Sequence, residues 1–190
     1  KRQIKNFAPS FGGINLEENG GLGGGGNGGY STETYPSESG NDGIDGTGGG
    51  GGGAFANSPH SYDDCNQHQG GRGGNGCVII RTLIGNKSKI GGVPTYTNEY
   101  SFNGQNYISY TYEKIKPNFN IGENMFHVNV DEDIPCDILL VGGGGGGGYG
   151  QCSNNDQEFS PNGPGGGGGG IIYQENVLFR RGEYNCCGGN

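Results

Sequence analysis

Apolar side chains are scarce in this chain of 190 residues, since aliphatic, aromatic and cysteine residues together supply only 29% of it. No apolar stretch approaches the ~20 residues that a membrane-spanning helix needs, so we expect no membrane span. A core built from side chains alone is in doubt, and another interaction must supply much of the stability if the chain folds. No stretch shows helical periodicity, which leaves β-strands and irregular structure.

Basic residues are also scarce, with 11 Lys and Arg against 19 Asp and Glu and a formal net charge of −8. Because phosphates are held by clustered Lys and Arg, we expect no nucleic-acid partner. The chain has no Cys-x-x-Cys pair, no Gly-x-Ser-x-Gly motif and no plausible Ser-His-Asp arrangement. His60 and His68 flank Cys65 at a spacing that fits no zinc pattern. We therefore expect no catalytic residues, no metal, no cofactor and no enzymatic activity.

Glycine is the abundant residue, with 47 positions, against a usual share of roughly 7%. There is no strict Gly-X-Y period and there are only 8 prolines, which excludes collagen. Composition alone suggests disorder, but 11 tyrosines and 8 phenylalanines are out of place in a solvated linker. The glycines gather in runs at 20–29, 48–53, 70–76, 142–148 and 165–170.

The run 142–148 directly follows the apolar residues 138–141 and allows three interpretations. A flexible linker would mix Ser with Gly, and a phosphate-binding loop would lead into a helix with Lys and Ser or Thr. The third is polyglycine II, an extended rod with three residues per turn whose N–H and C=O groups point sideways to neighbouring rods. Rods approach closely only where no Cβ intervenes. We favour this interpretation and expect structural roles for Gly23, Gly24, Gly50, Gly51, Gly144, Gly145, Gly167 and Gly168.

Residues 77–141 differ, because "CVIIRTLI", "EYSFNGQNYISYTYEKI", "NMFHVNV" and "CDILLV" are rich in β-branched and aromatic residues and predict strands. Asn103-Gly104 predicts a hairpin turn, and His127 is expected on the wet face of its strand. "GIIYQENVLF" and "GEYNCC" predict two later strands. The expected fold is mostly β with irregular structure: a polyglycine II bundle beside a small antiparallel, jelly-roll-like sheet, with essentially no α-helix.

Three segments are expected along the chain. Residues 1–81 form a glycine-rich half-unit that ends in a closing strand, residues 82–141 form the β-strand region, and residues 142–190 form a second glycine-rich half-unit.

An even number of cysteines in a chain with a small core favours disulfides and an oxidising, extracellular setting. Six cysteines allow fifteen pairings, so the connectivity stays open. The adjacent Cys186 and Cys187 are expected to point opposite ways on a strand, and one could bridge subunits. Asn86 lies in the only glycosylation sequon and could carry a glycan. The six candidates are Cys65, Cys77, Cys136, Cys152, Cys186 and Cys187.

Two acidic motifs contain carboxylates that are close together in sequence. "NDGIDG", with Asp42 and Asp45, has some character of a calcium loop but lacks the spacing and terminal Glu of an EF-hand, so we favour a structural turn. "VDEDIPCD" clusters residues 131–133 with Asp137, and a solvated hairpin end before Pro135 is the default interpretation.

The pieces "CDILLVGGGGGGGYG", "GGGGGGIIYQENVLFRRGEYNCCGGN" and "GGRGGNGCVIIR" resemble the glycine-rich domains of phage tail-fibre proteins and adhesins. They also resemble the glycine-rich region in ectodomains of anaplastic lymphoma kinase-type receptors. The resemblance implies a polyglycine II bundle beside a small sheet, outside the cell and without catalysis. It also implies that Cys77 and Cys136, which each begin a strand of one sheet, pair with each other.

The order of the pieces is circularly permuted relative to that family, since the closing piece lies at 70–81 and the opening piece at 119–141. The first residues, "KRQIKNFAPSFGG", lack an initiator Met and a signal-like apolar region, so we expect a mature or excised piece. A permuted order fits a slice of a tandem array, or a subunit whose two halves complete neighbouring units. Either one predicts a head-to-tail homopolymer, with strand exchange between subunits as a means.

The leading functional expectation is therefore a structural subunit of an extracellular filament. The alternative is an adhesin module that binds a receptor or glycan through loop aromatics, for which the candidates are Tyr30, Tyr35, Tyr62, Tyr149 and Phe159. A third possibility is ice binding through a flat polyglycine face, which the charged loops between the runs disfavour.

Overall fold

In a computed structural model the chain divides into two compact units. Residues 1–75 and 143–170, with Asn190, belong to the first unit, and residues 76–142 and 171–189 to the second. The described residues are 22–29, 37–56, 69–113, 125–149 and 163–187. They are mostly β with no α-helix, which confirms the predicted fold class, and they include no helix long and apolar enough to cross a membrane.

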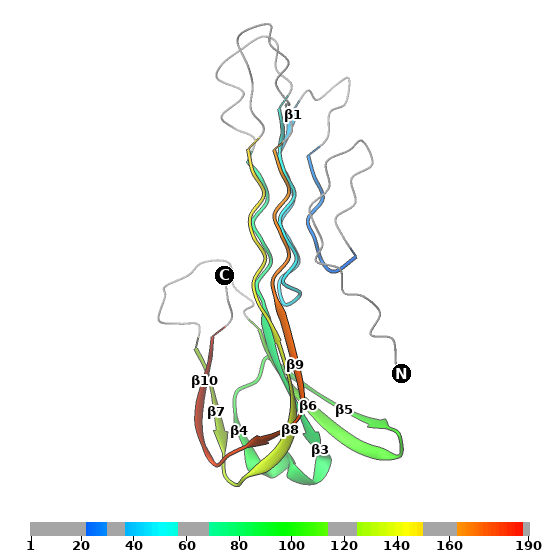
Figure 1. The fold of residues 1–190 in the computed structure, drawn as a ribbon, viewed down its shortest axis with the longest axis vertical. Coiled ribbons are helices and arrows are strands. Elements are labelled where there is room, and N and C mark those ends of the chain that lie inside the picture. The colour runs from blue at the N-terminus through cyan, green and yellow to red at the C-terminus, as the bar shows by residue number, and fades with distance from the viewer. Residues whose placement is uncertain (1–21, 30–36, 57–68, 114–124, 150–162, 188–190) are drawn as a thin grey trace, which may run out of the picture. The chain divides into compact units, whose positions relative to one another are not determined.

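The second unit contains two antiparallel sheets (Figure 1). The larger has the order β5 (Tyr96–Phe102), β6 (Gln105–Glu113), β3 (Cys77–Leu83), β8 (Ile134–Val141), β9 (Ile171–Phe179). The smaller has the order β10 (Gly182–Cys187), β7 (Met125–Val130), β4 (Ile90–Gly92). A 3-10 helix, η1 (Ile84–Lys89), connects β3 to β4. Every strand expected from the sequence in the described part of this unit is therefore present.

The core of the second unit is formed by residues of both sheets. Alternation along β7 buries Val128 and Val130 and leaves His127 exposed, as predicted for the wet face of this strand. Two rings from different sheets, Phe179 and Tyr184, lie with their centroids 4.2 Å apart. The buried cluster consists of Ile80, Ile90, Ile108, Tyr110, Tyr112, Val128, Val130, Ile134, Cys136 and Phe179.

The β5–β6 hairpin closes at Asn103-Gly104, which confirms the predicted turn. Phe102 pairs with Gln105, and the two turn residues have φ values of 52° and 76°. A two-residue turn with positive φ at both positions twists in the same sense as its strands. Asn and Gly are the residues that adopt this conformation most readily.

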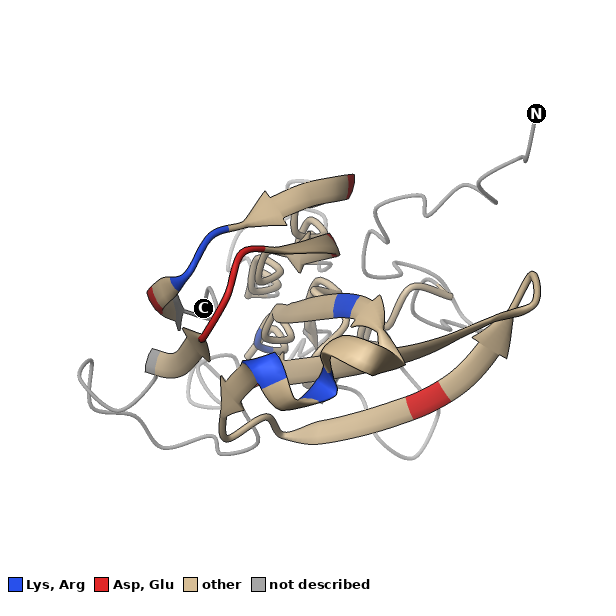
Figure 2. Ribbon diagram, turned by 90° about the horizontal axis from the view of Figure 1, so that it is seen from below, with Lys and Arg blue, Asp and Glu red and all other residues tan. Residues whose placement is uncertain are grey.

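Figure 2 marks the charged residues along the ribbon, and two ion pairs join elements of this unit that are not adjacent in the chain. Lys87 on η1 lies 2.6 Å from Glu99 on β5, and Lys89 lies 2.8 Å from Glu132 in the turn after β7. All four side chains are substantially exposed, so each pair contributes little to stability.

The first unit has one short antiparallel pair, β1 (Ser37–Glu38) with β2 (Phe55–Ala56). Apart from turns at 22–24 and 45–48, its other described residues are extended but belong to neither β-sheet nor helix. Their backbone groups pair in another way.

Candidate functional site: a polyglycine bundle

Extended segments lie side by side in the first unit and exchange backbone hydrogen bonds. We number them rods 1 to 6 in chain order: 22–29, 39–45, 48–54, 69–75, 143–149 and 163–170. Runs from both glycine-rich segments of the sequence contribute, since Gly144 in rod 5 donates to the carbonyl of Gly74 in rod 4 at 2.9 Å. One chain therefore supplies all six rods.

The hydrogen bonds recur every third residue. In rod 6, the N–H groups of Gly163, Gly166 and Gly169 donate to carbonyls of rod 3 at 2.7–2.8 Å. The acceptors, Ala54, Gly51 and Gly48, are spaced by three in the opposite direction, so these rods are antiparallel. A period of three is that of a helix with three residues per turn and no internal hydrogen bonds. Polyglycine II, predicted from the runs, is confirmed for the described part of the unit.

Rod 3 is the centre of the bundle, and its residues from Gly48 to Ala54 are all buried. It is hydrogen-bonded to each of the other five rods. Besides the bonds from rod 6, it accepts from Gly26 of rod 1 and Gly71 of rod 4, and it donates through Gly52 to Asn41 of rod 2 and through Gly51 to Gly145 of rod 5. Further bonds join rods 1 and 2, 2 and 4, 4 and 5, and 5 and 6. The N–H groups of Gly48, Gly51, Gly52 and Ala54 in this buried segment donate to carbonyls of neighbouring rods, which stabilises the segment without side-chain burial.

Close approach of the rods explains why the central residues are glycine. A Cβ on Gly50 would lie 2.0 Å from the carbonyl oxygen of Gly166, and one on Gly51 would lie 2.0 Å from that of Gly71. A Cβ on Gly144 would lie 2.2 Å from the carbonyl oxygen of Gly49. Each obstacle is backbone, so a side chain at these positions would push two rods apart.

Other candidate glycines are less constrained. A Cβ on Gly145 would meet its nearest atom at 3.5 Å, and one on Gly167 would meet nothing within 4 Å. Gly24 has φ +91°, and a Cβ there would lie 2.1 Å from Thr47 Oγ1, so it is required at a turn. Gly23 and Gly168 are half-buried.

The two aspartates of "NDGIDG" bond to the backbone of a neighbouring rod. Asp42 Oδ1 accepts from the N–H of Arg72 at 2.6 Å, and Asp45 Oδ1 accepts from that of Asn75 at 2.9 Å. The Arg72 guanidinium lies 3.8 and 3.5 Å from these carboxylates. This confirms the structural interpretation. The signal that sequence reasoning missed is the spacing of three between the two aspartates, which puts both on the same side of a rod.

The expected pairing of Cys77 with Cys136 is wrong, because both are buried free thiols. In the antiparallel ladder Cys77 lies opposite Val141, whereas Arg81 lies opposite Asp137. The starts of neighbouring antiparallel strands are at opposite ends of the pair. Burial and the nearby Glu113 carboxylate raise the pKa of Cys77, and burial raises the pKa of Cys136 to about 11.

The remaining disulfide candidates stay predictions. Cys186 and Cys187 are the last residues of β10, a strand as expected, although their side chains lie outside the described structure. Cys65 and Cys152 also lie outside the described residues, as do His60 and His68.

The acidic group of "VDEDIPCD" is divided by the fold. Residues 131–133 are exposed in the turn between β7 and β8, as expected. Asp137 is not solvated: it lies on β8, with a side chain only 15% exposed, and pairs with Arg81. The register of β3 and β8, which no local pattern reveals, brings these two residues together.

Two surface candidates have the following positions. Asn86 lies in η1, where its Nδ2 donates to Thr82 Oγ1 at 3.1 Å, and its glycosylation stays a prediction. Among the loop aromatics, Tyr149 is 64% exposed. Tyr30, Tyr35, Tyr62 and Phe159 lie outside the described residues.

Comparison with known proteins identifies part of this architecture. A family model described as a glycine-rich domain matches residues 123–186, which include β7 to β9, rods 5 and 6, and all of β10 except its last residue. The match covers about a third of the chain. No curated protein and no solved structure matches.

Adjacent glycines of rod 5 provide a matched test of rod contact. In Gly144→Ala the new methyl group collides with the backbone of rod 3, so we expect destabilisation of about 3 kcal/mol. In Gly145→Ala it has ordinary contacts and the unfolded chain loses freedom, so we expect stabilisation of at most about 1 kcal/mol. Guanidinium unfolding of both variants measures the difference. Equal effects at the two positions would contradict close rod contact.

The buried thiols predict a pH effect. Cys136 has a folded pKa of about 11 against an ordinary value of 9.0, so the unfolded state loses its proton first as pH rises. The stabilisation is complete below pH 9, and the free energy of unfolding falls between pH 9 and 11. Denaturant titrations measure this slope, which should be shallower in Cys136→Val.

The buried thiols should also be protected from alkylation. Iodoacetamide at pH 8 should leave Cys77 and Cys136 unmodified until the protein unfolds. Modification of either of these two thiols in the folded protein would refute their burial.

Proposed function

We propose that this protein is a structural subunit of an extracellular filament and that it assembles head to tail with copies of itself. In this proposal it is not an enzyme, and its contribution is mechanical stiffness. The observation that carries the proposal is the central rod, which is buried and hydrogen-bonded to five neighbours. Such a bundle resists bending because bending would break rows of backbone bonds together.

Edge strand β9 supports assembly through strand addition. It is nine residues long and lies at one edge of the five-stranded sheet, with Glu175 as its only charged residue. Ile171, Ile172 and Leu178 are 47%, 57% and 51% exposed. An exposed edge strand offers unpaired N–H and C=O groups to another chain, and natural proteins usually protect such edges with charge. An apolar edge of this length suits β-augmentation by a second copy.

The two edges of the five-stranded sheet differ, which favours an open polymer. β5, at the other edge, carries Glu99 paired with Lys87, and most of its residues are exposed. Pairing of unlike edges is a heterologous contact, which produces a filament when the rotation does not close a ring. Because one chain supplies all six rods, we place the contact between subunits at the sheet edges rather than in an exchanged rod.

The family resemblance adds to this proposal. The matched segment, 123–186, runs through β8, rods 5 and 6, and β9, while rods 1 to 4 precede it in the chain. We interpret this order as the circular permutation expected of a fibre repeat relative to tail-fibre and receptor glycine-rich domains.

Lysine in the edge strand should block assembly. We expect the purified full chain to form filaments visible by electron microscopy, and Ile172→Lys to lower the sedimentable fraction at least tenfold, because a charge on an apolar edge opposes strand addition. Leu22→Lys is the matched control, since Leu22 is fully exposed and lies outside both sheets.

Circular dichroism should show both variants folded. A chain that stays a monodisperse monomer at high concentration, or an Ile172→Lys variant that assembles as well as Leu22→Lys, would refute the proposal.

A further inference from the structure

The side of the five-stranded sheet that faces away from the core is rich in tyrosine. The register pairs Tyr100 with Tyr107 across β5 and β6, and Tyr173 with Leu139 across β9 and β8. These residues alternate with core residues such as Ile108 and Ile80, so they lie on the outer face. We define the tyrosine face as Tyr96, Tyr100, Tyr107 and Tyr173 with Arg81 between them.

Arg81 is the centre of the tyrosine face. Its Nε and Nη2 donate to Asp137 Oδ2 at 2.8 and 2.5 Å, and Nη2 also donates to the hydroxyl of Tyr173 at 3.2 Å. The guanidinium carbon lies 5.1 Å from the centroid of the Tyr107 ring, a cation–π distance. The ring of Tyr100 is stacked on that of Tyr107 at 6.0 Å. One cation thus links aromatic groups from both halves of the sheet.

The rings are held in fixed orientations while much of their surface stays in water. The Tyr96 hydroxyl donates to Glu113 at 3.0 Å, that of Tyr173 to Glu175 at 3.0 Å, and that of Tyr107 to Gln105 at 2.7 Å. Tyr96 is still 51% exposed and Tyr173 48% exposed. Exposed rings that are already oriented lose little conformational entropy when a ligand stacks on them.

The charge of the face selects the ligand class. Arg81 is neutralised by Asp137, and the other charged groups that hold the rings are the carboxylates of Glu113 and Glu175. An anionic ligand would meet a net negative surface. A neutral ligand for this face needs a ring surface that stacks on tyrosine. It also needs hydroxyl groups that donate to the carboxylate and amide oxygens beside the rings. Saccharides have both. Tyr96 and Tyr173 lie in one row across the sheet, four strand spacings or roughly 19 Å apart, which suits an oligosaccharide rather than one sugar.

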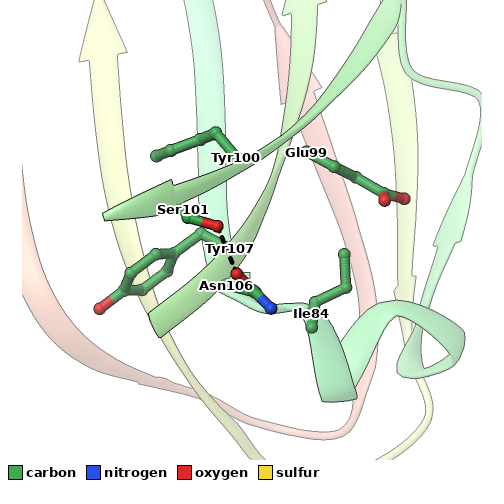
Figure 3. Close-up of a pocket in the computed structure, with 6 residues that line it drawn as sticks. All are labelled: Ile84, Glu99, Tyr100, Ser101, Asn106 and Tyr107. Carbon is green, nitrogen blue, oxygen red and sulfur yellow. Dashed lines mark hydrogen bonds between the residues drawn. The ribbon is translucent and has the colours of Figure 1, made fainter. Parts of the chain in front are cut away.

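A cavity of about 340 Å³ lies at the β5–β6 hairpin, mostly on the side opposite the tyrosine face, because Glu99, Ser101 and Asn106 in its lining alternate with Tyr100 and Tyr107. Figure 3 shows Tyr100 and Tyr107 directed to one side of this hairpin and Glu99 to the other, with a hydrogen bond from Ser101 to Asn106 between the strands. Its lining mixes the apolar Ile84 with these polar groups. Because most of its lining lies on the other side of the hairpin, this cavity is not part of the site proposed below.

We propose that the tyrosine face binds a neutral oligosaccharide, whose sugar rings stack on Tyr173 and Tyr96. Asp137 and Arg81 keep the platform rigid, and the carboxylates of Glu113 and Glu175 accept sugar hydroxyls. This site is separate from the loop aromatics such as Tyr149, and it does not depend on filament formation.

Titration of the full-length chain with neutral hexasaccharides of glucose, N-acetylglucosamine and mannose tests the proposal. Because the chain has no Trp, tyrosine fluorescence reports binding, and calorimetry gives the affinity. We expect at least one hexasaccharide to bind, with Tyr173→Ala and Tyr96→Ala each weakening it about tenfold through the lost stacking. Tyr173→Phe should retain most of the affinity. Tyr149→Ala is the matched control and should leave the affinity unchanged.

Thermal unfolding keeps a folding defect distinct from a binding defect, and Tyr173→Phe shows whether the ring itself is needed. The proposal is overturned if no neutral hexasaccharide binds at millimolar concentration. It is also overturned if Tyr149→Ala weakens binding as much as Tyr173→Ala. Capture of a proline-rich peptide or an acidic polysaccharide in place of the neutral sugars would likewise overturn it.

Discussion

The lateral hydrogen bond between chains that lack a Cβ is the interaction on which the first unit depends. Every third amide of a rod reaches a carbonyl of a neighbour, and the contact closes only because no side chain separates the two backbones. Ordering glycine is entropically costly, and one such bond contributes only about 1 kcal/mol net. The rods are therefore stable as a set. A smaller group of rods could neither bury the central rod nor pair its N–H and C=O groups with neighbours.

The second unit reaches stability by the more usual route of two sheets that enclose apolar side chains. The same chain segments serve both units, since β3 directly follows rod 4, β8 directly precedes rod 5, and rod 6 leads into β9. The neighbour order is the same in each: β3, β8 and β9 are adjacent in the sheet, and rods 4, 5 and 6 are successive partners in the bundle. A glycine run has no register signal of its own, so an attached strand with a defined register is a means of specifying its partner.

Local patterns predicted the elements of this fold well and their partners poorly. The alternation around His127 and the Asn103-Gly104 turn depend on neighbouring residues, and both predictions are confirmed. The pairing of Cys77 with Cys136 depended on long-range register and is wrong. The five runs look alike in sequence, so nothing local marks 48–54 as the central rod. Arg81 and its tyrosines come from four strands and were not predicted, although aromatic residues at alternate positions of two predicted strands were a usable signal.

Hydrogen exchange of individual glycine amides tests the central claim most directly. The N–H groups of Gly51, Gly52, Gly74 and Gly147 donate to other rods. The account predicts that they exchange as slowly as the amides of the β-sheet core, such as that of Ile80, because they open only when the bundle unfolds. Exchange of these glycines at the rate of an unstructured peptide, while Ile80 stays protected, would contradict it.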